Sequence, residues 1–160
     1  MDPAKTHQDK YQFSHVLKYA LMATAGYIII FVIMRILNLH IIPELRALNY
    51  ILLFIIAALA IKTYKEDSKN QMSYLEGFLT GLFVANVSFA VFALIMYVYL
   101  KFLDVAFLQF IVDYSPMGIN LTPLSAALLI FFEGQAIGIV TALILMQYFK
   151  KDINKITKTI

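Results

Sequence analysis

Four long apolar blocks, separated by short charged segments, dominate the pattern of this chain. A helix that crosses a hydrocarbon layer about 30 Å thick needs about 20 mostly apolar residues. The fourth block carries one charge, Glu133, and the third has no charge from Gly77 to Leu100. The pattern therefore predicts an all-α integral membrane four-helix bundle with spans at about 18–39, 45–64, 74–100 and 122–149.

The second block is the shortest, because only Ala47 to Ile61 is free of charge. Arg46 and Lys62 lie at its ends, where long basic side chains reach the lipid headgroups. Without this span, the basic ends of the chain would fall on opposite sides of the membrane. We therefore count it as a span.

The segments outside the spans are polar and basic. Residues 1–17 are expected to form a polar N-terminal arm, either loose or lying at the interface, before the four-span domain of 18–149. The residues 150–160 form a basic tail. Thr122 followed by Pro123 is typical of an N-cap and a first helical residue, which indicates the start of the fourth span.

The distribution of lysine and arginine predicts the orientation of the spans. Ten of the 13 basic residues lie in or at the edge of the N-terminal arm, the second connection and the C-terminal tail, and three lie in or beside the other two connections. Cytoplasmic flanks carry the excess of basic residues. Both termini are therefore predicted to be cytoplasmic, as an even number of spans requires.

Composition agrees with this prediction and excludes several classes of protein. The chain is 61% hydrophobic and 14% charged, against about 45–50% and about 25% in soluble domains. It has no cysteine, so a disulfide framework, a thiolate nucleophile and a cysteine zinc site are excluded. The basic residues form no folded patch with aromatic stacking partners, which argues against a nucleic-acid partner.

A repeated small-residue motif is the strongest internal signal. The third and fourth spans both contain the pattern E-G-x-x-x-G-x-x-x-A, in which residues four apart share one helix face. In lipid, close approach of backbones and van der Waals contact drive helices together. The two strips are predicted to pack either on each other or on a second copy of the protein. Their members are Gly77, Gly81 and Ala85 in one helix and Gly134, Gly138 and Ala142 in the other.

The two glutamates of this motif have different surroundings. Glu76 begins its helix, where a carboxylate favours the positive end of the helix dipole. Glu133 lies about a dozen residues into its span, where an ionised carboxylate costs on the order of 2.5–3.5 kcal/mol. We expect Glu133 to belong to an intramembrane polar cluster, with Arg35 as its candidate partner and with Asn86 and Gln135 adding hydrogen bonds.

Three roles for Glu133 stay open at this point. It either forms a structural polar pair that fixes helix register, or couples the movement of protons or ions, or contacts another protein. Catalytic and metal sites are not indicated, because the chain has no H-E-x-x-H, phosphate-loop, nucleophile-elbow or dinucleotide motif. We expect no enzyme activity and no cofactor.

The layout resembles a known group of proteins. A charged turn from Ile61 to Asp67, followed by Tyr74-Leu75-Glu76-Gly77-Phe78 at the entry to the third span, resembles a bacterial membrane family catalogued as domain of unknown function 4199. The resemblance covers about 19–151. It implies a small multi-pass protein of the bacterial inner membrane, and it carries no activity or site residue with it.

The sequence thus leads to two main functional hypotheses, with a membrane-embedded enzyme acting on lipid as a third and weaker option. The first is an accessory or scaffold subunit that assembles through its glycine-rich helix faces, in contact with membrane lipids and either with its own copies or with a larger membrane protein. The alternative is a small oligomeric transporter or channel that uses Glu133 as its intramembrane ionisable group.

Overall fold

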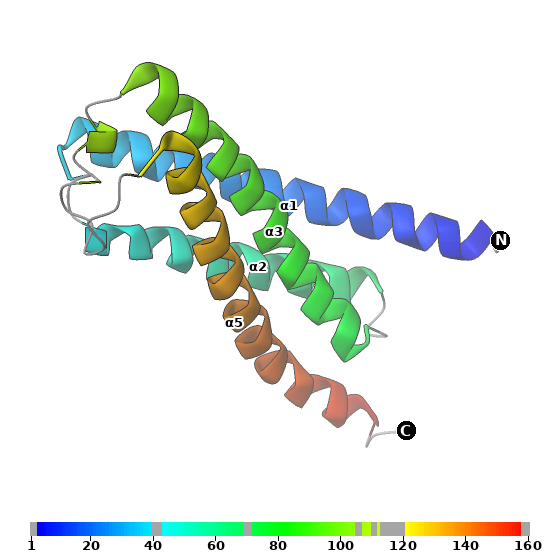
Figure 1. Ribbon diagram of the computed structural model, residues 1–160. Helices are drawn as coiled ribbons and strands as arrows, with labels where there is room; N and C mark the ends of the chain where they lie inside the picture. Colours follow the sequence, from blue (N-terminus) through cyan, green and yellow to red (C-terminus); the bar gives the residue numbers. More distant parts are fainter. Residues whose placement is uncertain are drawn as a thin grey trace.

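The protein is a bundle of four long helices (Figure 1). A computed structural model describes residues 3–39, 43–68, 72–104, 107–109, 112 and 121–157. The long helices are α1 (Pro3–Ile36), α2 (Ala47–Asp67), α3 (Tyr74–Val98) and α5 (Pro123–Thr157). A 3₁₀ turn, η1 (Pro43–Arg46), precedes α2, and a π-helical turn, η2 (Tyr99–Leu103), extends α3.

Each long helix contains a segment long and apolar enough to cross a membrane. The four segments are Phe13–Ile36, Ala47–Asp67, Tyr74–Leu103 and Pro123–Phe149. The described residues contain no strand. The prediction of an all-α membrane bundle is therefore confirmed at the level of helix number, length and composition, and the chain is a multi-pass membrane protein.

Two helices are longer than their spans. Helix α1 begins at Pro3, so the expected loose arm is wrong in this respect, because most of it continues the helix of the first span. The last residues of the predicted arm are also packed in the bundle, since His15 and Val16 are buried. Helix α5 runs on to Thr157 within the basic tail. The longest outer connection predicted at 101–121 falls mostly outside the described residues.

Helix α3 lies at the centre of the bundle and packs on the three other long helices (Figure 1). The described ends of α1 and α5 nearest the two termini lie at the same end of the bundle, as an even number of spans requires. Lipid provides no hydrophobic force that holds the helices together, so their association depends on close packing. Small residues allow the helix backbones to approach closely. The buried alanines of α1 and α2 are Ala20, Ala23, Ala57 and Ala60.

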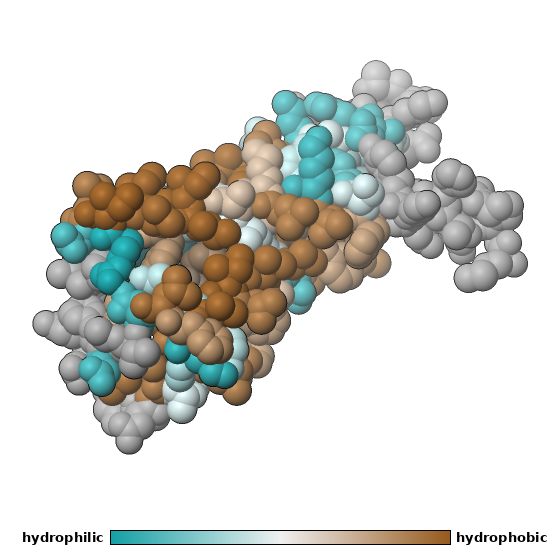
Figure 2. All heavy atoms as spheres, turned by 90° about the horizontal axis from the view of Figure 1, so that it is seen from above, coloured by the Kyte–Doolittle hydropathy of each residue, from teal (hydrophilic) through white to brown (hydrophobic). Residues whose placement is uncertain are grey.

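The outer surface of the bundle is apolar. Large hydrophobic side chains stay exposed on every long helix, and they fill the middle of the face shown in Figure 2, with hydrophilic patches toward its ends. Examples are Ile29, Ile51, Leu94 and Phe132, each at least half exposed. Such a continuous apolar surface requires lipid as its solvent.

Polar groups tie α1 to its neighbours inside this apolar bundle. His15 Nε2 lies 2.9 Å from the Ala60 carbonyl oxygen, and Tyr19 Oη donates to Thr63 Oγ1 at 2.9 Å. Further along, Thr24 Oγ1 donates to the Ser88 carbonyl of α3 at 3.2 Å. These bonds satisfy groups that would otherwise be unpaired in a medium without water.

Helix α3 begins with a capping box. The Ser73 hydroxyl accepts a hydrogen bond from the Glu76 backbone N–H at 3.3 Å, and the Glu76 carboxylate accepts one from the Ser73 N–H at 2.7 Å. Thr122 caps α5 in the same way, because its Oγ1 accepts from the Ser125 N–H at 3.2 Å. The predicted start of the fourth span at Thr122-Pro123 is confirmed.

We expect Ser73→Ala to lower the free energy of unfolding by about 1 kcal/mol, because the N–H of Glu76 loses its acceptor. Thermal unfolding in mild detergent, followed by circular dichroism, measures the change. Ser68→Ala is the control, because the Ser68 hydroxyl donates only to carbonyls at the end of α2. An equal loss in both variants would contradict the capping role of Ser73.

Candidate functional site

The two small-residue strips lie against each other within one chain, between α3 and α5. A Cβ added to Gly81 would lie 3.2 Å from Ala142 Cβ, and one added to Gly138 would lie 2.5 Å from Ala85 Cβ. Each step of four residues along α3 matches a step of four back along α5, as in an antiparallel pair with one face each in contact. The small residues of these strips therefore pack α3 against α5 within one chain.

The two ends of this interface follow the same register. A Cβ on Gly77 would lie 2.5 Å from Met146 Sδ, and one on Gly134 would overlap the Phe89 ring. Phe89 is buried, and its ring stacks on Tyr27 of α1 at 5.0 Å between centroids. Gly134 is thus the position at which a ring from α3 crosses the backbone of α5.

The expected polar cluster is divided into three separate contacts. Asn86 and Gln135 do meet, because Asn86 Nδ2 donates to Gln135 Oε1 at 3.0 Å. This pair joins α3 to α5 beside the small-residue strips, and Asn86 is exposed in the isolated chain.

Arg35 forms its ion pair with Asp104, at the end of α3, rather than with Glu133 as we expected. Asp104 also accepts hydrogen bonds from Tyr99 Oη at 3.0 Å and from the Phe107 N–H at 2.9 Å. Asp104 lies in the segment expected to be an outer connection, so its approach to α1 was not foreseen. The physical reason is that η2 prolongs α3 and carries Asp104 back over the end of α1.

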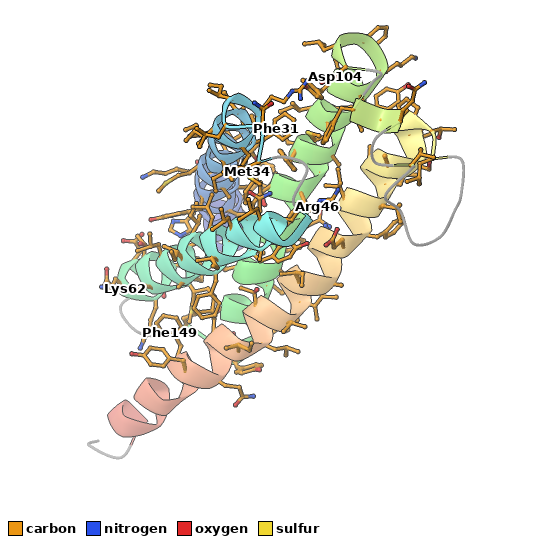
Figure 3. The ribbon with its side chains drawn as sticks, turned by 90° about the vertical axis from the view of Figure 1, so that its left-hand side faces the viewer. Phe31, Met34, Arg46, Lys62, Asp104 and Phe149 are labelled. Atoms are coloured by element: carbon orange, nitrogen blue, oxygen red, sulfur yellow. The ribbon has the colours of Figure 1, made fainter. Side chains whose placement is uncertain are left out.

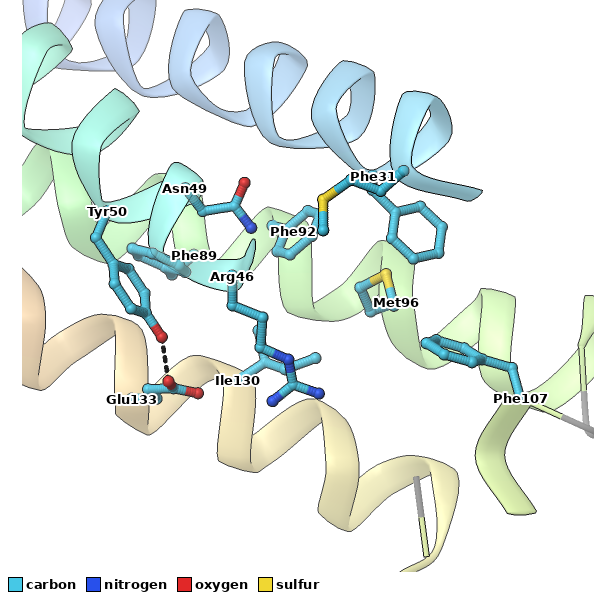
Figure 4. A pocket seen from close by; sticks show the side chains of 11 residues that line it. Phe31, Arg46, Asn49, Tyr50, Phe89, Phe92, Met96, Phe107, Ile130 and Glu133 are labelled. Atoms are coloured by element: carbon cyan, nitrogen blue, oxygen red, sulfur yellow. Dashed lines mark hydrogen bonds between the residues drawn. The ribbon is translucent and has the colours of Figure 1, made fainter. Parts of the chain in front are cut away.

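Glu133 accepts a hydrogen bond from the Tyr50 hydroxyl of α2 (Figure 4). The Glu133 side chain is exposed in the isolated chain, and Tyr50 takes the place of Arg35 as its partner. The carboxylate thus lies where α2 and α5 border a surface that faces lipid. Such a position is costly for a charge unless a partner or a cavity receives it.

A cavity of about 80 Å³ adjoins this carboxylate. It lies at the end of the bundle where α1 finishes and where η1 leads into α2. Side chains of all four long helices, of η1 and of Phe107 surround the space (Figure 4). The lining residues are Phe31, Met34, Arg46, Asn49, Tyr50, Phe89, Phe92, Met96, Phe107, Ile130 and Glu133.

Most of the cavity wall is apolar, and its polar groups gather on one side. Arg46 extends between α2, α3 and α5, as Figure 3 shows from another direction. Asn49, Tyr50 and Glu133 complete the polar side. Oδ1 of Asn49 is buried and has no hydrogen-bond partner in the part of the chain that the structure describes.

Sequence reasoning missed the roles of Arg46, Asn49 and Tyr50. Arg46 was interpreted as a basic residue reaching the headgroups at the end of a span. Tyr50 has the amphipathic side chain that is common at membrane interfaces. The spacing of these residues could have indicated their roles. Asn49 and Tyr50 follow Arg46 by three and four residues, so both lie on the same side of the helix start as Arg46.

The fold and the cavity define a class: a multi-pass α-helical membrane protein with an ionisable cavity between its spans. No protein-family model, curated protein or solved structure matches the chain. The resemblance to domain of unknown function 4199 therefore stays a prediction. No cluster of three or more potential metal ligands occurs within the described residues.

Proposed function

We propose that this membrane protein is a small transporter in which Glu133 is the ionisable group that couples proton movement to the occupancy of the cavity. The observation that carries the proposal is the position of the Glu133 carboxylate, which lines a cavity between the spans. A polar pair with a purely structural role would be expected inside a helix interface, where both partners are enclosed and the energetic cost of the charge is lower.

The surroundings of the carboxylate support such a role. The Tyr50 hydroxyl donates to Glu133, and the apolar side chains of Phe89 and Ile130 line the same cavity. A ligand that enters the cavity therefore meets the carboxylate, so that proton binding and ligand binding share one group.

We propose the bacterial inner membrane as the location of the protein, with both termini in the cytoplasm. The excess of lysine in the flanks at the ends of α1, α2 and α5 supports this orientation. The cavity then opens near the outer face, because it lies at the end of the bundle opposite the termini.

The proposal predicts a proton flux that depends on Glu133. Purified protein is placed in liposomes that contain a pH-sensitive dye, and a potassium gradient with valinomycin drives protons inward. The wild-type chain is expected to acidify the lumen faster than protein-free liposomes do. Glu133→Gln is expected to return the rate to that of protein-free liposomes, because an amide carries no titrating proton.

Two controls separate this result from misfolding. The first is the thermal unfolding of Glu133→Gln, which is expected to stay close to that of the wild type because the amide keeps an oxygen that accepts from Tyr50. The second is the flux of Glu66→Gln, which removes an exposed carboxylate at the opposite end of α2 and is expected to match the wild type. Equal fluxes in Glu133→Gln and the wild type would contradict the proposal. A wild-type flux no greater than that of empty liposomes would do the same.

An accessory or scaffold role is the second candidate. The hydrogen-bonded Asn86–Gln135 pair supports it, because Asn86 is an exposed amide within a span and another membrane protein would shield it from lipid. The partner surface would have to lie beside the small-residue strips, since α3 and α5 bury those strips against each other. Gentle detergent extraction followed by mass spectrometry of bound proteins distinguishes this role from transport.

A further inference from the structure

Two opposite charges border the same cavity without pairing with each other. Arg46 and Glu133 both line it, yet the ion pairs among the described side chains are Arg35–Asp104 and Lys62–Glu66. Charges that border an apolar space are costly unless a partner compensates them. A molecule that carries both an anionic and a cationic group would compensate the two at once.

The acceptor on the polar side points to the kind of cation. The Glu133 carboxylate accepts from the Tyr50 hydroxyl and has further acceptor sites for N–H or O–H donors. A primary ammonium supplies three such donors, whereas a trimethylammonium supplies none. The guanidinium of Arg46 is suited to the oxyanion, because its planar set of donors matches phosphate.

The size and position of the cavity point to a lipid. About 80 Å³ holds a small polar group, given that one water molecule needs ~10–15 Å³ on the same scale, but it does not hold a whole amphiphile. Arg46 and Glu133 are exposed, so the space reaches the surface of the chain. That surface is apolar beside Glu133, where Leu129 and Phe132 are 54% and 63% exposed. Acyl chains can therefore stay in the bilayer while the headgroup enters.

We propose that the cavity binds the headgroup of a zwitterionic aminophospholipid, with the ammonium at Glu133 and the phosphate at Arg46. This inference rests on the proposed function, because it names the substrate class of the same site. The chemistry required is a primary ammonium close to a phosphate ester, and the test separates the lipid from a free headgroup.

The experiment is native mass spectrometry of the full chain in detergent with equal amounts of phosphatidylethanolamine, phosphatidylcholine and phosphatidylglycerol. We expect preferential retention of phosphatidylethanolamine. Arg46→Gln and Glu133→Gln are each expected to reduce that retention about tenfold, because each removes a charge-assisted hydrogen bond. Lys101→Gln and Glu66→Gln are the matched controls, since neither residue lines the cavity, and they are expected to leave it unchanged.

Other outcomes would overturn the inference. Equal retention of phosphatidylcholine would show that the site does not recognise the N–H donors of the headgroup. Preference for phosphatidylglycerol would show that the site recognises only the anionic group. Competition by free phosphoethanolamine as strong as that by the lipid would assign the site to a soluble headgroup. Lipid binding and proton flux are measured in separate experiments. Retention of phosphatidylethanolamine without proton flux would support the proposed ligand and contradict transport. Proton flux without retention would support transport and contradict the proposed ligand.

Discussion

Gly134→Ala is expected to lower the free energy of unfolding by about 1–3 kcal/mol, although alanine is the better helix former. Helix propensity alone would favour alanine by about 1 kcal/mol. Packing reverses the sign, because the new Cβ would overlap the Phe89 ring, which is buried and stacked on Tyr27. Unfolding in mixed detergent micelles, followed by circular dichroism, measures the loss.

Two further variants identify the cause of this loss. Gly77→Ala should cost less, because its Cβ meets the flexible thioether of Met146 instead of a ring. Phe89→Leu in the Gly134→Ala background should recover part of the stability, since it removes the overlapping ring. If Gly134→Ala proved as stable as the wild type, α3 and α5 would not pack at this register.

Asp104→Ala is expected to destabilise the end of the bundle at which α1 and α3 finish, by about 1–3 kcal/mol. The carboxylate accepts hydrogen bonds from Arg35, Tyr99 and the Phe107 N–H, and its side chain is only 12% exposed. Removing it leaves three donors without their acceptor. Asp104→Asn should cost less, because the amide oxygen still accepts from an N–H.

A double-mutant cycle with Arg35→Gln and Asp104→Asn isolates the ion pair. We expect an interaction energy of about 0.5–2 kcal/mol. The same cycle at Lys62 and Glu66 is the control and should give about 0.3–0.5 kcal/mol, because both of those side chains are more than 60% exposed. Equal values for the two pairs would show that Arg35 and Asp104 are no better shielded than a surface pair.

The candidate site was only partly predictable from the sequence. Asn86 and Gln135 were expected to add hydrogen bonds around Glu133 because they lie at a similar depth, whereas in the structure they bond to each other. The partner of Glu133 did not follow. Arg35 was chosen because it is basic and intramembrane, whereas the hydrogen-bond partner of Glu133 is Tyr50, whose side chain is typical of an interface.

The sequence by itself determined the class of protein, since the length and apolarity of four blocks require four membrane-crossing helices. It also determined where α5 begins, because Thr122 and Pro123 act through local backbone bonds. Only the tertiary structure decided which helix faces meet and where space is left between them. Sequence gives the depth of a residue along its own helix, but the rotation and relative length of neighbouring helices depend on contacts between distant segments. The cavity is lined by side chains of all four long helices, so no local pattern predicts it.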